Sequence, residues 1–262
     1  MAALQQLIAM PAPADVLSPS SCSQFLGCGF KYCCRKVLHL PDPPTGALTL
    51  GRSLHAAIGA NFEQKIETHE DLPAAGVVAV YRQAWAESSV ETEFRDDENP
   101  KELKELGEAL TVKYLDEAAP KIQPAAVEFQ VCGQIGGVAV HGYVDLLDVQ
   151  GRIIDLKSAA RKPGDISNDY RFQIATYAQL IPGGTNKARL DTLTKTKKPE
   201  LVQQEFTVEP SDVEQTQKLY PAVQQAIRAG HFLPNRSSNL CSRRYCSFWR
   251  RCELEFGGKV AG

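Results

Sequence analysis

The stretch that decides the fold is VAVHGYVDLLDVQGRIIDLKSA, residues 138–159. It holds two segments in which apolar and polar residues alternate, as they do in β-strands with one buried face. A turn ending at Gly151 separates the two segments. The segment AVEFQVC, residues 126–132, alternates in the same way and is followed by a glycine-rich turn. The three segments together predict an antiparallel meander.

The length of the loop between the last two strands decides which carboxylates share a face. A two-residue loop ending at Gly151 would put Asp145 and Asp155 on opposite faces of the sheet. A three-residue loop ending at the same glycine pairs Asp148 with Arg152 and sets Asp145 across from Asp155. It also suits a type I turn closed by a glycine in the left-handed conformation. We therefore predict the three-residue loop.

The facing carboxylates suggest a metal site. Along the last strand Asp155 and Lys157 share one face, while Leu156 points into the core. With Asp145 opposite, two carboxylates suit Mg²⁺ or Mn²⁺, and the neighbouring amine could stabilise negative charge on a phosphate. An ordinary surface cluster of Asp and Lys has the same spacing, and spacing alone slightly favours that alternative.

Four motifs stand in the order His55, GYVD at 142–145, IIDLK at 153–157 and QIATY at 173–177. This ordered set resembles the RecB-like PD-(D/E)XK nucleases, and the likeness runs from about Leu17 to Cys252. It includes the flanking cysteines of the iron–sulfur subgroup, which contains the AddB-type helicase-nucleases and the CRISPR-adaptation nucleases. The order of the motifs carries the resemblance, because each motif alone is common.

The resemblance implies a role for each matching residue. Asp145 and Asp155 would bind the metal, His55 would supply an imidazole ligand, Leu156 would offer its backbone carbonyl, and Lys157 would be the catalytic lysine. Without the other motifs, a histidine on an apolar helix is more often a core residue than a ligand.

Three further residues are candidates for the same site. Gln173 and Tyr177 lie four apart on one helical face, which the resemblance gives to the active-site edge, in contact with DNA or Lys157. A polar rim on a packed helix is the ordinary alternative. Glu128, in the first strand, is a further possible metal ligand, although a surface position is commoner for glutamate.

The fold implied is α/β: a restriction-endonuclease-like core with a mixed sheet, in which an antiparallel meander is followed by a crossover helix. We expect a disordered tail over 1–17 and a single nuclease domain over 18–262. Within that domain we expect an N-terminal helical region over 18–120, a catalytic core over 121–210, and a final helix with a cysteine-rich tail over 211–262. The first long helix is expected to begin near Thr49 or Gly51.

The eight cysteines gather at the two ends of the chain. Such a distribution favours metal ligands over scattered core thiols or a disulfide framework. The resemblance implies a structural [4Fe–4S] cluster that joins the two ends, with ligands Cys28, Cys241, Cys246 and Cys252. Relatives have proline where this chain has Gly29, so Cys22, Cys33 and Cys34 remain alternatives for the first ligand. Four thiolates could equally hold structural zinc. Cys132 lies apart from both groups.

A net charge of -2 gives the whole chain no attraction to a polyanion, so DNA contacts must come from local basic patches. The candidates are Lys195, Lys197, Lys198, Arg243 and Arg244. A solvated surface is the ordinary reading of each patch. No apolar run approaches the roughly 18 residues of a membrane span, and the start lacks a basic secretory signal. We expect a cytoplasmic protein.

The function predicted is that of a Mg²⁺- or Mn²⁺-dependent deoxyribonuclease. We expect an exonuclease or end-processing enzyme on single-stranded DNA, in recombination, repair, phage replication or CRISPR adaptation, with a helicase or CRISPR-adaptation protein as a possible partner. A DNA-binding or end-recognition subunit with conditional or no cleavage is the main alternative. A zinc-containing α/β protein with an incidental Asp-x-Lys motif is the third.

Overall fold

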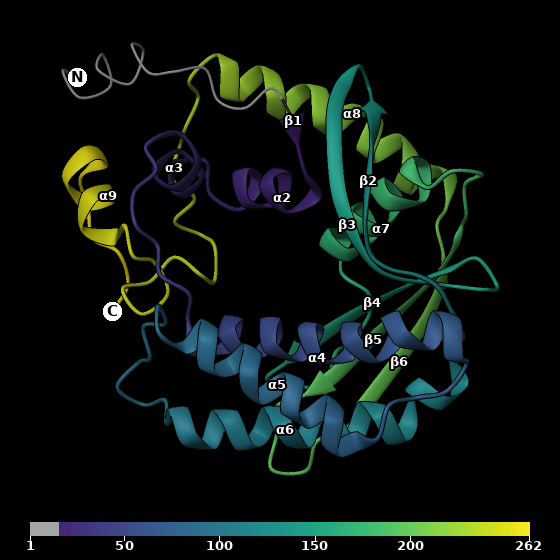
Figure 1. Cartoon of the computed structure of the whole chain (residues 1–262). Coiled ribbons are helices and arrows are strands. Elements are labelled where there is room, and N and C mark those ends of the chain that lie inside the picture. Colours follow the sequence, from purple (N-terminus) through teal and green to yellow (C-terminus); the bar gives the residue numbers. More distant parts are fainter. Residues whose placement is uncertain (1–15) are drawn as a thin grey trace. The chain divides into compact units, whose positions relative to one another are not determined.

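Figure 1 shows the computed structural model, which describes residues 16–262. The disordered tail expected over 1–17 therefore lies outside the described residues except for its last two. These two, Val16–Leu17, form strand β1, which pairs in parallel with β3 at Ala139 and Val140. None of the described helices is long and apolar enough to cross a membrane.

The contacts within the chain divide it into two compact units. The terminal unit contains the residues up to Asp42 together with 132–142 and 210–262, and the central unit contains 43–131 and 143–209. The first boundary between the units follows Asp42, within the helical region expected over 18–120. The single nuclease domain over 18–262 stays a prediction.

The sheet has the mixed topology expected. Strands β2 (Pro124–Ile135), β3 (Val138–Asp148) and β4 (Arg152–Ala159) form the meander. Helix α7 (Asn168–Leu180) then crosses to β5 (Lys187–Thr194), which pairs in parallel with β4, and β6 (Leu201–Thr207) returns antiparallel. The strand order is β1-β3-β4-β5-β6, and β2 also pairs with β3. The predicted α/β class is confirmed.

The hairpin between β3 and β4 has the predicted three-residue loop. Leu146 pairs with Ile154 and Leu147 with Ile153, and the same register sets Asp145 opposite Asp155. The amide of Gly151 donates to the carbonyl of Asp148 at 2.9 Å, and φ of this glycine is +72°. A positive φ is the conformation that glycine adopts without strain, which explains why this loop closes there.

Three helices of the central unit pack beside its strands: α4 (Gly46–Thr68), α5 (Ala74–Ser89) and α6 (Pro100–Glu117) (Figure 1). Their apolar side chains join Ile154 and Leu156 of β4 in one core. Helix α4 begins at Gly46, three residues before Thr49, which was the first of the two expected starts. It begins there because Thr45 caps it by accepting from the amide of Leu48 at 3.4 Å. The core of the central unit therefore fixes α4 against the strand that carries Asp155 and Lys157.

The terminal unit contains α2 (Pro19–Gly27), α3 (Gly29–Tyr32), a π-helical turn (Cys33–Val37), α8 (Pro210–Arg228) and α9 (Trp249–Phe256). Ser18 caps α2, because its side chain accepts from the amide of Ser21 at 3.1 Å. Helix α9 was not predicted. It spans only eight residues of a tail rich in Cys and Arg, too few for a clear helical period.

Candidate active site

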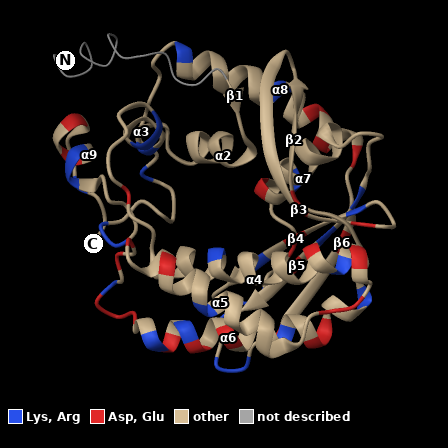
Figure 2. Cartoon of the chain, in the orientation of Figure 1, with Lys and Arg blue, Asp and Glu red and all other residues tan. Residues whose placement is uncertain are grey.

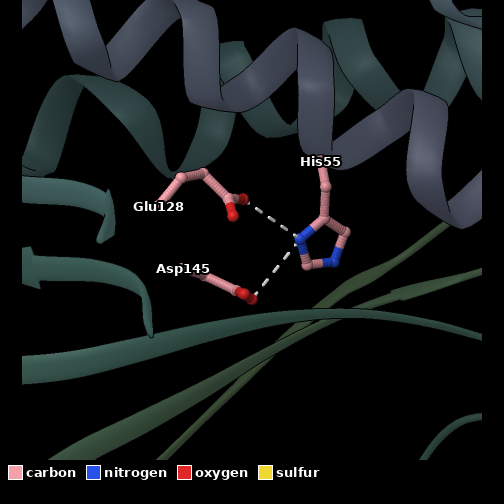
Figure 3. A group of neighbouring side chains, drawn as sticks. All are labelled: His55, Glu128 and Asp145. Atoms are coloured by element: carbon pink, nitrogen blue, oxygen red, sulfur yellow. Dashed lines mark ion pairs between the residues drawn. The ribbon is translucent and has the colours of Figure 1, made fainter. Parts of the chain in front are cut away.

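Three potential metal ligands meet in the central unit, each from a different element (Figure 3). His55 comes from α4, Glu128 from β2 and Asp145 from β3. His55 Nδ1 lies 3.5 Å from Asp145 Oδ2 and 3.7 Å from Glu128 Oε1. The ligand atoms of all three lie within 4.8 Å of one another, the one such group found among the described residues.

The chemistry of this donor set fits a divalent cation. Two carboxylates suit Mg²⁺ or Mn²⁺, and an imidazole adds a ligand that Mn²⁺ accepts more readily than Mg²⁺ does. The three side chains also line a cavity of about 20 Å³, whose other walls are mostly apolar. This volume holds a single water-sized particle. It is therefore the set of donors that favours one divalent ion.

Glu128 reaches the group through an unusual backbone conformation. Its φ is +43°, although it lies in the interior of β2. This left-handed backbone conformation costs a non-glycine residue of the order of 1–3 kcal/mol. Gly59 of α4 faces it, and a Cβ there would lie 3.5 Å from Glu128 Cγ. A Cβ at that distance makes an ordinary contact, so the feature that distinguishes Glu128 is its positive φ.

The backbone of Leu156, on β4, links His55 of α4 to Asp145 of β3. Its carbonyl lies 2.8 Å from His55 Nε2, and its amide donates to Asp145 Oδ2 at 2.9 Å. Burial disfavours the charged imidazole, but the carboxylates of Asp145 and Glu128 outweigh it and raise the pKa of His55. The expected ligands His55, Asp145, Glu128 and the Leu156 carbonyl are thus brought together.

Asp155 belongs to an adjoining network. Asp155 Oδ2 lies 2.7 Å from Lys157 Nζ and forms an ion pair with it, but the geometry is not that of a hydrogen bond. Asp155 Oδ1 accepts a hydrogen bond from Gln173 Nε2 at 3.0 Å. Burial raises the pKa of Asp155 to about 6, although Lys157 opposes the rise. Burial also opposes the charge of Lys157, but Asp155 and Asp145 hold its pKa above the usual range. Lys157 is therefore a fixed cation beside the metal-binding group.

Helix α7 supplies the far side of this network. Gln173 Nε2 also donates to the Tyr177 hydroxyl at 3.1 Å, so Gln173 contacts Asp155 directly and Tyr177 contacts Gln173. Lys157 lies instead over the ring of Tyr170, 5.8 Å from its centroid. Tyr170 was not among the predicted residues. Its spacing, three residues before Gln173 and seven before Tyr177, places it on the same helical face and could have revealed it.

The predicted DNA-contacting residues lie in two places. The turn between β5 and β6 carries a run of basic side chains (Figure 2), in which Lys197 and Lys198 are exposed. Lys195 is half-buried, and burial lowers its pKa. In the terminal unit Arg243 lies 4.6 Å from the Trp249 ring centroid, and Arg244 lies 5.7 Å from that of Tyr245.

Three of the predicted ligands, Cys28, Cys246 and Cys252, pack around Phe30 and Phe248 in the terminal unit, together with Cys34, one of the alternatives. The fourth predicted ligand, Cys241, lies near those three. The backbone amides of Lys31 and Asn235 donate to Cys28 Sγ, each at 3.5 Å. Within residues 16–262, no three cysteine thiols lie within 4.8 Å of one another. The cysteines left open as alternatives are buried, and burial raises the pKa of their thiols, to about 12 for Cys22, about 11 for Cys33 and about 12 for Cys34.

Comparison with known proteins bears on the family and the fold of this chain. Residues 16–253 match the model of the PD-(D/E)XK nuclease superfamily. The crystal structure of "Putative exonuclease" from Eubacterium rectale is similar, with a TM-score of 0.61 and 14% identity over 92% of this chain and 88% of that one, which supports the fold. The crystal structure of SSO0001 aligns with a TM-score of 0.40 and 15% identity over 92% and 94%. No curated protein sequence matches significantly. Because the family match spans most of its length, the chain belongs to the PD-(D/E)XK nuclease superfamily.

Proposed function

We propose that this protein is a divalent-metal-dependent deoxyribonuclease that hydrolyses phosphodiester bonds. The proposal rests on the meeting of His55, Glu128 and Asp145 beside the ion pair of buried Asp155 and half-buried Lys157. A set of potential ligands next to a fixed cation is the arrangement that phosphodiester hydrolysis requires. Membership of the nuclease superfamily supports the same activity.

His55, Asp145 and Glu128 would hold Mg²⁺ or Mn²⁺, with Asp155 and the Leu156 carbonyl as further ligands. When bound, the ion neutralises charge on the scissile phosphate and lowers the pKa of a water. Lys157 would stabilise the negative charge that develops on the phosphate, because its ammonium is fixed by Asp155. Gln173 would orient Asp155 through its hydrogen bond of 3.0 Å, and Tyr177 would in turn orient Gln173.

We take the substrate to be DNA with free ends, mainly single-stranded. Lys195, Lys197, Lys198, Arg243 and Arg244 would contact phosphates. The resemblance stated from the sequence suggests a task in recombination, repair, phage replication or CRISPR adaptation, with a helicase or a CRISPR-adaptation protein as partner. The likeness to a protein named as an exonuclease is consistent with action at ends.

The cysteine cluster of the terminal unit would hold a structural [4Fe–4S] group through Cys28, Cys241, Cys246 and Cys252. Four thiolates could equally hold zinc, so the resemblance stated from the sequence is what favours the iron–sulfur group. The two amides donating to Cys28 Sγ would stabilise its thiolate.

The test is cleavage of end-labelled DNA by anaerobically purified protein. Linear single-stranded, linear duplex and circular single-stranded substrates are incubated with Mn²⁺, with Mg²⁺ or with EDTA. We expect linear single strands to be degraded with either metal, EDTA to stop the reaction, and the circle to survive. Binding without cleavage under every condition would instead support an end-recognition subunit.

A further inference from the structure

A large cavity extends from the candidate active site along helix α4. Its volume is about 680 Å³, within the range of roughly 300–1,000 Å³ that is usual for ligand sites. One wall is the exposed surface of α4 and the other is the end of β4, at Lys157 and Ser158. His55 lies between these walls. A ligand in this cavity would therefore touch the residues that carry the proposed chemistry.

The two ends of the cavity differ in charge. Arg52 lies one turn before His55 on α4, and Glu63 lies eight residues after it, so the two are about 16 Å apart along the helix. Glu128 adds a second carboxylate on the far side of His55. A phosphate chain would be attracted to the Arg52 end and repelled from the Glu63 end.

The groups at the basic end are available to a ligand. Arg52 is exposed and Ser158 is half-buried, and neither has an ion pair or side-chain hydrogen bond within residues 16–262. Gly51 leaves the space between them open, because the one atom within 4 Å of a Cβ built there is Ser158 Oγ, at 4.0 Å. A guanidinium and a hydroxyl facing a shared space are donors that phosphate oxygens accept.

We infer that this cavity holds the backbone of one DNA strand next to the scissile phosphate, with Arg52 and Ser158 as phosphate contacts. The inference rests on the proposed nuclease function and adds to it the path of the strand. The strand would leave the active site toward the N-terminal end of α4, because the other end is acidic. The volume is that of a small-ligand site, so it accommodates a short stretch of a single strand rather than a duplex.

Two variants test this path, each with a matched control in the central unit. Arg52→Gln removes the charge, and Arg82→Gln removes the same charge on α5, where Arg82 pairs with Glu108 outside the cavity. Gly51→Leu fills the cavity. Gly76→Leu makes the same change on α5, where no atom lies within 4 Å of a built Cβ. Leucine keeps good helix propensity at both positions.

The measurement is fluorescence anisotropy with a labelled oligothymidylate in EDTA, over a series of salt concentrations, together with KM and kcat in Mn²⁺. We expect Arg52→Gln to raise Kd about fivefold at low salt and to flatten the salt dependence by about 0.7, the slope of one single-strand phosphate contact. KM should rise with kcat unchanged. Gly51→Leu should raise Kd at least about tenfold, and both controls should behave as wild type.

The outcomes separate this inference from the proposed function. If wild type cleaves DNA but Arg52→Gln and Gly51→Leu bind it like their controls, the strand does not follow this cavity and the inference is overturned. Weaker binding in both variants without any cleavage by wild type would support the strand path and overturn the nuclease proposal. A wild-type protein that neither binds nor cleaves would overturn both.

Discussion

Asp145 Oδ2 accepts a hydrogen bond of 2.9 Å from the backbone amide of Leu156, which ties the carboxylate of β3 to the strand that carries Asp155 and Lys157. The carbonyl of the same residue faces His55 on α4. One residue of β4 therefore sets the positions of a carboxylate and an imidazole from two other elements. The arrangement explains how residues far apart in the sequence form one site.

The pair Asp155–Lys157 is expected to be essential for cleavage. Lys157→Ala should lower kcat at least about 100-fold, because it removes the fixed cation beside the phosphate, while Kd for DNA changes little. It also leaves Asp155 without its ion-pair partner, so the free energy of unfolding should fall by about 1–3 kcal/mol. Single-turnover rates and thermal melting measure the two effects. Lys162→Ala, which removes an exposed lysine paired with Glu200, is the control. Wild-type rates in Lys157→Ala would remove this residue from the mechanism.

His55 is predicted to contribute to metal affinity. His55→Ala should shift the Mn²⁺ activation curve to concentrations about 10–100-fold higher, and it should narrow any preference for Mn²⁺ over Mg²⁺, since the imidazole is the softer ligand. The control is His141→Ala, a change on β3 outside the group of ligands. An unchanged activation curve would make His55 a core residue.

Glu128 should show opposite effects on stability and on function. Glu128→Gly relieves the positive φ of 43°, so we expect a gain in unfolding free energy of about 1 kcal/mol, together with weaker Mn²⁺ binding. Glu128→Gln keeps the backbone strain and removes only the charge, so it should weaken binding without the gain in stability. Thermal melting and Mn²⁺ titration separate the two. A loss of stability in Glu128→Gly would contradict the strain argument.

Gln173 is predicted to act through Asp155. Gln173→Leu should lower kcat about tenfold because Asp155 loses its hydrogen bond, and Tyr177→Phe should have a smaller effect because it removes only the partner of Gln173. The control is Gln179→Leu, which removes another glutamine six residues later on α7, where the side chain donates to the backbone carbonyl of Ala175. Equal rates in Gln173→Leu and Gln179→Leu would show that the hydrogen bond has no catalytic consequence.

The cysteine cluster is predicted to stabilise the terminal unit before it affects chemistry. Serine at Cys28, Cys241, Cys246 or Cys252 should lower iron and labile-sulfide content together with the melting temperature, because each removes a ligand. Cys132→Ser should change neither, since this thiol is exposed on β2. Full iron content in Cys28→Ser would transfer the first ligand to Cys22, Cys33 or Cys34. Stoichiometric zinc without iron in anaerobic wild type would contradict the cluster itself.

The hairpin that carries Asp145 and Asp155 could be predicted because its determinants are local. Alternation fixes the faces of the two strands, and Gly151 fixes the turn, so the register followed from a few neighbouring residues. The fold class followed in the same way, from the strands and the crossover helix. The start of α4 at Gly46 could not be predicted in this way, because a capping threonine before a glycine is a weak signal in the sequence.

The parts that could not be predicted depend on tertiary contacts. Glu128 lies beside His55 with a positive φ in the interior of a strand, and such a backbone conformation has no periodic signature in the sequence. The contact of Gln173 with Asp155 depends on how α7 packs on the sheet. The division of the chain after Asp42 depends on contacts between segments that are distant in sequence.

Electron paramagnetic resonance of bound Mn²⁺, measured together with DNA cleavage in wild type and in Asp145→Asn, tests most directly whether this group of ligands holds the catalytic metal. Asp145 belongs to the group of potential ligands, and asparagine keeps its size while removing its charge. We expect wild type to bind Mn²⁺ and to cleave linear DNA, and we expect the variant to lose Mn²⁺ binding and cleavage while it remains folded. Undiminished Mn²⁺ binding and cleavage in Asp145→Asn would contradict this expectation.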